Sequence, residues 1–383
     1  MSPYLPRLIA AITLATMCLL SGCGSKSNPM PCNCTNPGAS SYLYAAVANS
    51  ILSFKLGTDG TPTLLASQAG PNDSGGLVAD SSSKFVYVSD FSNGEIDAFT
   101  INKSTGALTQ VTGSPFSTGP APGAGIAIDP QTRFLYLTNS SGVLGYTINS
   151  STGALTSITG SPFPAGSTPI QVIVDPTGKF LYASNNGDSM GTISAYSIDS
   201  TTGALTPIAG SPFPTQPNFP GPAGFAFGGG GKFLYVGMAG TANANNVVSG
   251  FAVDSTTGAL TQLAGSPFAA GKDPGHIASD PKGKFLFTAN SQDNTVSAFT
   301  IDGTSGALTL IAGSPFAAGG GPVSLAVDRD GAFVYLGMQP SPIAGTKGLS
   351  AFKIDGTSGA WTPLAGSPFA TSQFFFGVTV AKP

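Results

Sequence analysis

The chain has 383 residues and a formal net charge of −3, and only 9% of its residues are charged, against a usual ~25%. It contains no cluster of lysine and arginine, which excludes the electrostatic footprint of a nucleic-acid-binding protein. All four cysteines precede residue 41 and there is one histidine, so we expect no disulfide in the folded domain, no metal site and no cofactor.

Residues 1–22 have the pattern of a signal peptide. Arg7 precedes a largely apolar run of 13 residues, Leu8–Leu20, which is short for a membrane span and typical of an export signal. The following Leu20-Ser21-Gly22-Cys23 resembles the bacterial lipoprotein box, in which the cysteine becomes the lipidated N-terminus. An ordinary signal peptide cut near Gly22 is the alternative. Gly24 implies sorting to the outer membrane by the same resemblance.

Residues 23–40 are rich in serine, proline, asparagine and glycine and are predicted to form a flexible tether behind the lipidated Cys23. Cys32 and Cys34 lie in this segment. A disulfide between them is strained but possible in an oxidising compartment. The folded domain is therefore expected over residues 41–383.

A motif of the form Ala-(Leu/Trp)-Thr-x-x-x-Gly-Ser-Pro-Phe recurs through residues 41–383. Its six copies end at Phe116, Phe163, Phe213, Phe268, Phe316 and Phe369. A repeat of roughly 45–55 residues that is rich in strand-forming residues indicates a radial array of small sheets. The sequence thus predicts an all-β fold, a seven-bladed β-propeller with four-stranded blades.

One repeat illustrates the expected blade. We predict four strands at His276–Asp280, Lys284–Asn290, Thr295–Asp302 and Ala307–Ala312, here called A to D in order. Strands B and C carry apolar residues on both faces, as expected for a sheet packed between two others. The first repeat starts with a B strand and the last A strand is Gly377–Ala381, so the C-terminal strand is predicted to close the ring by pairing with the N-terminal strands.

Loop lengths indicate which face carries a site. The A-to-B turns keep one length, whereas the distance from the start of strand B to the strand C aromatic varies from 13 residues (Arg133 to Tyr146) to 20 (Ala332 to Phe352). The D-to-A loops vary as well, and alternating strand direction puts both kinds on one face. The longest variable loops are Pro214–Gly224, Ala239–Asn246 and Gln339–Lys347. We expect the ligand at this face.

The recurrent Asp-Pro-x-Gly-Lys-Phe-Leu-Tyr-x-x-Asn, followed by Thr-(Val/Ile)-Ser-Ala-(Phe/Tyr)-x-Ile-Asp, resembles the lactonase-like seven-bladed propellers, which include 6-phosphogluconolactonases and the carboxymuconate cyclase type, and also the YVTN-type surface propellers. The lactonase pattern implies a Pro-Arg-His before a strand A and an Asn-Glu after a strand B. Here the nearest matches are Pro274-Gly275-His276 and Asn290-Ser291. The histidine is retained, and the arginine and glutamate are not.

His276 is consequently the candidate catalytic residue, a general base at the channel mouth, although it can also be a rim residue that holds a loop. The candidate binding residues lie at strand ends and in the variable loops: Asp90, Asn139, Asn185, Asp273, Asn290 and Asp293. Asp90, Asn93 and Glu95 could form a calcium site, but their spacing does not match that of an EF-hand loop. The basic residues Lys84, Arg133, Lys179, Lys232 and Lys284 lie at the constant-length turns and are expected to be solvated, and the aspartates that precede them to shape those turns.

The missing arginine and glutamate favour a binding or interaction module over an enzyme. We therefore expect a monomeric lipoprotein of the cell envelope that binds a neutral small molecule, a glycan or an envelope protein. A lactone hydrolase of altered specificity that uses His276 is the alternative, and a purely structural envelope protein is a third possibility. In each case the membrane is contacted through the lipid alone.

Overall fold

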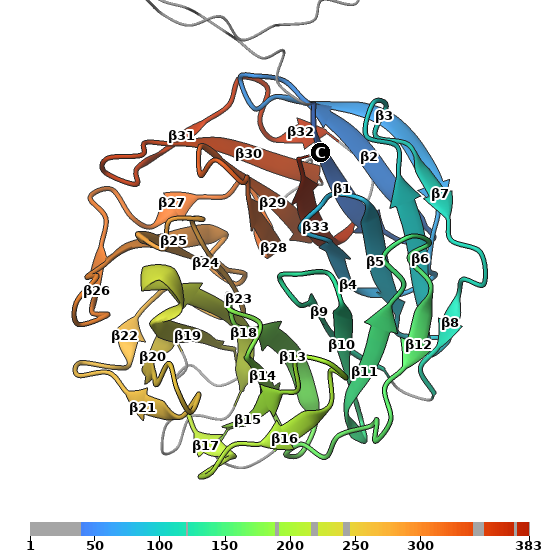
Figure 1. Cartoon of the computed structure of the whole chain (residues 1–383). Helices are drawn as coiled ribbons and strands as arrows, with labels where there is room; N and C mark the ends of the chain where they lie inside the picture. Colours follow the sequence, from blue (N-terminus) through green and yellow to red (C-terminus); the bar gives the residue numbers. More distant parts are fainter. Residues whose placement is uncertain are drawn as a thin grey trace, which may run out of the picture. The chain divides into compact units, whose positions relative to one another are not determined.

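The computed structural model describes residues 40–119, 122–187, 191–215, 221–239, 246–339, 348–370 and 374–382. The signal peptide, the tether with Cys23, Cys32 and Cys34, and parts of the three longest loops (216–220, 240–245 and 340–347) lie outside these residues. Over the described part, the chain forms seven antiparallel sheets arranged around a central axis (Figure 1). None of the helices in this part is long and apolar enough to cross a membrane.

Each sheet is one blade, with four strands in order from the axis outward. The innermost strands are β33 (Phe375–Ala381), β4 (Ser74–Ala79), β9 (Pro122–Ile128), β13 (Pro169–Val174), β18 (Pro222–Gly228), β23 (His276–Ser279) and β28 (Gly321–Val327). The second strands are β1 (Ser41–Val47), β5 (Phe85–Asp90), β10 (Phe134–Asn139), β14 (Phe180–Asn185), β19 (Phe233–Met238), β24 (Phe285–Asn290) and β29 (Phe333–Gln339). We number the blades 1 to 7 in the order of these lists.

The two outer positions complete each blade. The third strands are β2 (Ser50–Leu56), β6 (Glu95–Ile101), β11 (Gly142–Ile148), β15 (Thr192–Ile198), β20 (Val247–Val253), β25 (Thr295–Ile301) and β30 (Gly348–Ile354). The fourth strands are β3 (Pro62–Ala69), β7 (Leu108–Gln110), β12 (Leu155–Ser157), β16 (Leu205–Pro207), β21 (Leu260–Gln262), β26 (Leu308–Leu310) and β31 (Trp361–Pro363). The fourth strand of blade 6 is thus shorter than the predicted Ala307–Ala312.

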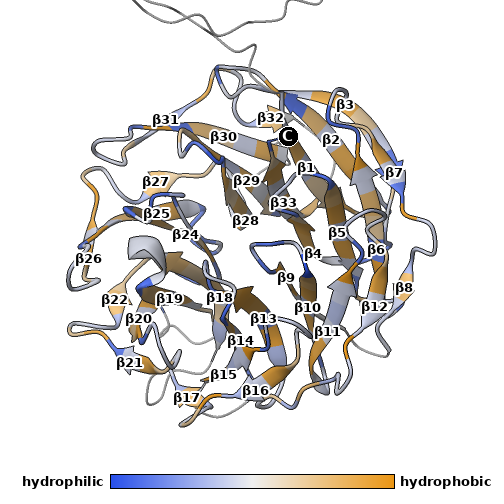
Figure 2. Ribbon diagram, in the orientation of Figure 1, coloured by the Kyte–Doolittle hydropathy of each residue, from blue (hydrophilic) through white to orange (hydrophobic). Residues whose placement is uncertain are grey.

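The second strands form the core because both of their faces are covered. In five of the seven blades every residue of this strand is buried, and Figure 2 shows the inner strands as predominantly hydrophobic. Because these strands carry apolar side chains on both faces, neither face is exposed to solvent, and each can pack against a neighbouring blade. The apolar clusters accordingly join residues of consecutive blades.

The predicted closure of the ring is confirmed. Strand β33 pairs with β1 in antiparallel register from Tyr42 opposite Ala381 to Ala46 opposite Gly377. The side chain of Phe375 is completely buried in a cluster that contains residues of β1, β2 and β29. The C-terminal strand is therefore the innermost strand of blade 1.

The repeated Gly-Ser-Pro-Phe motif returns the chain to strand C of its own blade. In five blades the residues at the end of the motif form a fifth, two-residue strand: β8 (Phe116–Ser117), β17 (Phe213–Pro214), β22 (Phe268–Ala269), β27 (Phe316–Ala317) and β32 (Phe369–Ala370). The motif serine anchors this return, since its hydroxyl accepts a hydrogen bond from a strand C amide, as Ser314 does from Ala298 at 2.9 Å. The motif phenylalanines then pack into the clusters between blades, as Phe116 does.

A second interblade contact uses the tyrosine in the middle of the second strand, which every blade except blade 6, with Phe287, has. Its hydroxyl donates a hydrogen bond to a glycine carbonyl in the C-to-D turn of the next blade, as Tyr87 does to Gly153 at 2.9 Å and Tyr136 to Gly203 at 2.8 Å. Tyr335 makes the same contact with Gly60 at 2.8 Å. This bond joins blade 7 to blade 1 and completes the ring.

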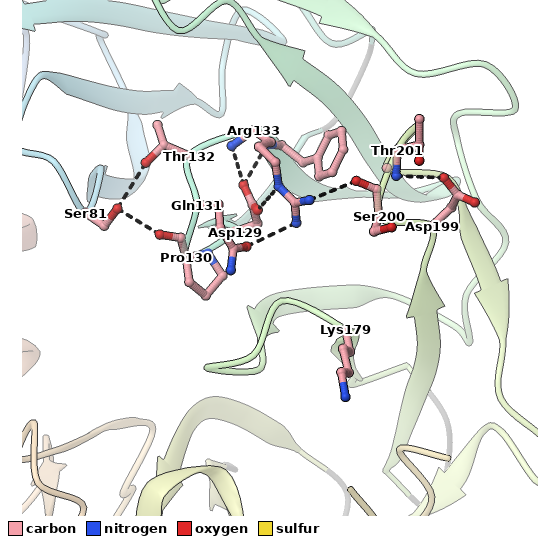
Figure 3. A network of polar contacts seen from close by, with 12 residues as sticks. Ser81, Asp129, Pro130, Gln131, Thr132, Arg133, Lys179, Asp199, Ser200 and Thr201 are labelled. Atoms are coloured by element: carbon pink, nitrogen blue, oxygen red, sulfur yellow. Dashed lines mark hydrogen bonds and ion pairs between the residues drawn. The ribbon is translucent and has the colours of Figure 1, made fainter. Parts of the chain in front are cut away.

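At the constant-length face, the aspartates that end the first strands shape the turns as expected. The Asp129 Oδ1 accepts hydrogen bonds from the amides of Arg133 and Phe134. Arg133 is more than the solvated residue that the sequence led us to expect. Its guanidinium pairs with Asp129 at 2.9 Å and donates to the Ser200 carbonyl of the next blade at 2.8 Å (Figure 3).

Lys84 and Lys284 cross to the next blade in the same way, donating to the carbonyls of Ser151 and Thr357 at 3.2 and 2.9 Å. These cations fasten neighbouring blades. Lys84, Arg133 and Lys284 of the basic row therefore belong to the scaffold.

Candidate functional site

A cavity opens where the variable loops meet the innermost strands. It encloses about 630 Å³. Asp73 and Phe374, which line it, lie in D-to-A loops. Gln339 lies at the end of a second strand, and Phe91 lies in the B-to-C loop that follows one. Strand β23 also contributes to the wall. The cavity thus lies at the face that the loop lengths indicated.

His276 opens β23 and lines this cavity. Its side chain is accessible to water within the cavity, and no described residue forms a hydrogen bond with the imidazole. Protein atoms nevertheless surround the ring inside the channel, and this desolvation lowers the pKa of His276 to about 4, against the opposing influence of the Asp273 carboxylate. The imidazole is consequently neutral at pH 7, with a nitrogen lone pair available to accept a proton.

The loop before His276 is held by a small polar network. The backbone of Asp273 has a φ of 57°, and its Oδ2 accepts a hydrogen bond from the Ser291 hydroxyl at 2.5 Å. The Asp273 carbonyl also accepts a hydrogen bond from the amide of Gly275 at 2.8 Å. Both Asp273 and Ser291 line the cavity, so a carboxylate lies close to the neutral imidazole.

Gly275 and Ser291 occupy the positions where the lactonase pattern has arginine and glutamate. A Cβ atom at Gly275 would come within 3.3 Å of the Ala239 Cβ, which is a tight contact for a side chain. The wall is therefore built closely around glycine here. Among the described residues that line the cavity, none is a lysine or an arginine, and the charged ones are Asp73 and Asp273.

Of the six predicted binding residues, Asp273 is the one that lines the cavity within the described part of the chain. Asp90, Asn139, Asn185 and Asn290 end their second strands and are buried. Their side chains shape the turns or hold the blade together, as Asn290 does by donating to the hydroxyl of Ser297 at 2.9 Å. Asp293 accepts a hydrogen bond from the Lys272 amide at 2.7 Å and lies in the loop beside the cavity. A binding role for these five stays a prediction.

Two of the three possible calcium ligands are already engaged with each other. Asp90 accepts hydrogen bonds from the amide and the side chain of Asn93 at 3.1 and 2.8 Å. The described residues contain no group of three or more histidine, cysteine, aspartate or glutamate side chains that could hold a metal ion. Burial, together with the charges of Asp90 and Glu95, raises the pKa of nearby Asp97 to about 6.

Sequence reasoning missed Gln171 as a site residue. It lies on β13, where the tripeptide Pro169-Ile170-Gln171 corresponds to Pro274-Gly275-His276, and it lines the same cavity as His276. The two side chains also share a deeper compartment of about 120 Å³, together with Phe376. The sequence did contain a signal for Gln171, because it aligns with His276 in the repeat. Equivalent positions on the innermost strands face the same channel.

The aromatic residues of the variable loops surround the mouth. The Phe91 side chain is 48% exposed, and the rings of Phe374 and Phe376 pack against each other with centroids 4.5 Å apart. All three line the cavity. The site thus combines aromatic surface, side-chain amides and one neutral imidazole, which suits an uncharged polar ligand.

Comparison with known proteins supports the family assignment. The family model described as "Lactonase, 7-bladed beta-propeller" matches residues 113–219 and 214–316, and these two matches together span more than half of the chain. No curated protein matches the sequence.

Solved structures are similar at low identity. A candidate 6-phosphogluconolactonase of Bacteroides fragilis is 19% identical with a TM-score of 0.72, covering 92% of this chain and 100% of its own. The periplasmic gluconolactonase of Pseudomonas aeruginosa is 19% identical with a TM-score of 0.69, covering 90% and 100%. A protein of Lactobacillus plantarum is 20% identical, also with a TM-score of 0.69, covering 89% and 99%. These similarities establish the fold, and with the matched sequence model they show that the chain belongs to the lactonase family of seven-bladed β-propellers.

Proposed function

We propose that the protein hydrolyses an uncharged lactone in the cavity at the variable face, with His276 as the general base. The observation that carries the proposal is the position of this imidazole in the cavity. The only histidine of the chain lines a cavity of about 630 Å³, and desolvation by the surrounding protein lowers its pKa to about 4, which favours the neutral form.

The reaction requires two proton transfers, one from water to the imidazole and one from the imidazolium to the leaving alkoxide. The imidazole takes a proton from water, the resulting hydroxide adds to the lactone carbonyl, and the ring C–O bond breaks as the imidazolium returns the proton to the leaving alkoxide. The Asp273 carboxylate favours the transient imidazolium. The Gln171 side-chain amide, which lines the same cavity, is the donor we assign to the developing oxyanion.

The substrate should be neutral because no described lining residue is a cation. A phosphorylated sugar lactone would require lysine or arginine to hold its phosphate, and the two carboxylates of the wall would repel it. The Pseudomonas aeruginosa neighbour is described as a periplasmic gluconolactonase, and glucono-δ-lactone is an uncharged lactone of suitable chemistry. It is therefore our first test substrate.

The second candidate is a binding module without catalysis. It is favoured by Gly275 and Ser291, which leave the site without the arginine and glutamate of the lactonase pattern. One experiment separates the two functions: hydrolysis of glucono-δ-lactone and 6-phosphogluconolactone by the wild type and by His276→Gln, measured above the spontaneous rate. We expect turnover of the neutral lactone by the wild type only. A ligand-induced rise in Tm without turnover would instead favour the binding module.

We further propose that Cys23 is lipidated and that the protein is anchored in the cell envelope, in the outer membrane. The support is the Leu20-Ser21-Gly22-Cys23 box behind a short apolar run. Cys23→Ser should release soluble protein or leave uncleaved precursor, detected by membrane fractionation. Wild type and variant that fractionate identically, with no lipid on either, would contradict the anchor.

A further inference from the structure

One position on the rim of the cavity that His276 lines, here called the channel cavity, is aromatic in a single blade. Phe91 directly follows β5, lines the cavity and has a side chain that is 48% exposed. Ser291 and Gln339 occupy the equivalent position in blades 6 and 7 and line the same cavity. The residues at this position in all the other blades are small or polar: Ala48, Ser140, Asn186, Ala239, Ser291 and Gln339. Phe91 is therefore the one aromatic member of this rim.

The backbone that carries Phe91 is held on both sides. The Phe91 amide donates to the Asp73 carbonyl at 2.8 Å. The next amide, that of Ser92, donates to the buried carboxylate of Asp90 at 3.0 Å, and the Gly94 amide closes the turn on the Asp90 carbonyl at 3.1 Å. A half-exposed phenyl ring on a fixed turn loses little conformational freedom when a ligand covers it.

Two further phenylalanines extend the aromatic surface inward. Phe376 of β33 lines both the channel cavity and the deeper compartment that His276 also lines. Its ring packs against that of Phe374, with centroids 4.5 Å apart, and Phe374 lines the channel cavity as well. The pair thus leads from the compartment of the imidazole toward the rim.

This pair and Phe91 belong to neighbouring blades. Strand β33 of blade 1 lies beside β4 of blade 2, since a Cβ atom at Gly377 would come within 3.3 Å of the Leu77 Cβ (Figure 1). Asp73 directly precedes β4 and also lines the cavity. Its carboxylate accepts one hydrogen bond, from the Ser92 hydroxyl at 3.3 Å, and a carboxylate can accept several. The wall beside Phe91 therefore offers an acceptor for a ligand hydroxyl.

The channel cavity is larger than a single sugar lactone requires. Its volume of about 630 Å³ is that of a site for a drug-sized ligand, for which roughly 300–1,000 Å³ is usual. The deeper compartment beside His276 has about 120 Å³. A lactone whose carbonyl lies at the imidazole consequently leaves the outer part of the cavity, with Phe91 and Asp73, to a second group.

We propose that this outer part is a subsite for a second sugar ring, so that the substrate is a neutral disaccharide lactone; the proposal rests on the proposed hydrolysis at His276. A pyranose ring has a face of C–H groups that can cover the phenyl ring of Phe91, and its hydroxyls can donate to Asp73. An acyl chain is disfavoured, because it would desolvate the Asp73 carboxylate without donating a hydrogen bond.

The linkage between the two sugars follows from the position of the reacting carbonyl. In a δ-lactone, the ring carbon opposite the carbonyl carbon points away from the group that attacks the carbonyl. With the carbonyl at His276, a substituent on that opposite carbon extends toward the rim and Phe91. A gluconolactone that carries a glucosyl group on its 4-hydroxyl has this arrangement.

Lactams, which the proposed hydrolysis does not consume, separate binding from turnover. Cellobiono-δ-lactam carries the second ring, glucono-δ-lactam lacks it, and both are uncharged. Isothermal titration calorimetry of the wild type should show about tenfold tighter binding of the disaccharide lactam, because it adds the contact with Phe91 and a hydrogen bond to Asp73. Phe91→Ala should reduce this ratio to about threefold or less.

Matched variants show whether a flat ring is what matters. Phe91→Tyr keeps the ring and should retain the ratio, whereas Phe91→Leu keeps an apolar side chain without a flat face and should lose most of it. Leu310→Ala removes a similarly exposed side chain, 50% exposed, from β26. Leu310 is not among the described residues that line the channel cavity, so this control should leave the ratio unchanged.

Equal affinities of the two lactams for the wild type, or an unchanged ratio in Phe91→Ala or Phe91→Leu, would overturn the subsite. Turnover of glucono-δ-lactone that depends on His276 would then still support the hydrolysis. Conversely, a tenfold ratio that Phe91→Ala abolishes, without turnover of glucono-δ-lactone or cellobiono-δ-lactone, would support the subsite and refute the hydrolysis. No binding of either lactam would refute both.

Discussion

Two adjacent phenylalanines of the closing strand should destabilise the protein to very different extents when truncated. Phe375 of β33 is completely buried among residues of blades 1 and 7. Phe376 points the other way, because successive side chains of a strand alternate, and it lines the channel cavity. Phe375→Ala therefore tests whether β33 closes the ring, and Phe376→Ala is its control on the same strand.

The magnitude follows from burial. Removing a fully buried phenylalanine costs about 3–5 kcal/mol, whereas truncating the partly exposed Phe376 should cost about 1 kcal/mol or less. An unfolding entropy of about 2.1 cal/mol/K per residue gives roughly 0.7 kcal/mol/K for a unit spanning Ala39–Pro383. The Tm of Phe375→Ala should then fall by about 4–7 °C.

Thermal unfolding followed by circular dichroism measures both variants against the wild type. Deletion of residues 374–383 should be more severe than Phe375→Ala, because it also removes the backbone pairing of β33 with β1. Equal Tm values for Phe375→Ala and Phe376→Ala would contradict the burial of Phe375 between blades 1 and 7. An unchanged melting curve after the deletion would refute closure by this strand.

Three further predictions concern single groups. Tyr335→Phe removes the hydrogen bond to the Gly60 carbonyl and should lower the free energy of unfolding by about 0.5–1.5 kcal/mol; no loss in chemical denaturation would contradict its role in closing the ring. The His276 ring protons should titrate in NMR near pH 4, because burial lowers this pKa to about 4, and a midpoint near the usual 6.5 would show a fully solvated imidazole. Burial raises the pKa of Asp97 to about 6 from 3.8, so the folded state holds its proton more tightly and stability decreases as the pH rises through this interval. Asp97→Asn should consequently have a higher Tm than the wild type at pH 7, with the difference vanishing near pH 4.

The fold could be predicted from the sequence because each repeat specifies the same local structure. Apolar residues on both faces of strands such as Phe285–Asn290 require neighbours on both sides, and the offset between the first and last repeats places Gly377–Ala381 in blade 1. The Gly-Ser-Pro-Phe motif marks the period of the repeat. Its serine hydrogen bond to strand C became visible only in the structure, because the bond depends on how the chain folds back.

The site was harder to predict, because the apolar pattern that identifies the strands does not show which polar residues face the cavity. Where both faces of a strand are apolar, the pattern does not tell which way a polar residue at its end points, and Asn185 and Asn290 turn out to be buried within their blades. His276 stood out by its uniqueness. Gln171 did not, although it occupies the equivalent position on β13 and lines the same cavity.

The central claim, that His276 acts as a base on a neutral lactone, is tested most directly by the pH dependence of kcat/KM for glucono-δ-lactone. With a base whose pKa is lowered to about 4, we predict that wild-type activity above the spontaneous rate rises through about pH 4 and is level from there toward neutrality. His276→Gln should abolish it. Equal activity in the wild type and His276→Gln across this range, or no wild-type activity at any pH, would contradict the claim.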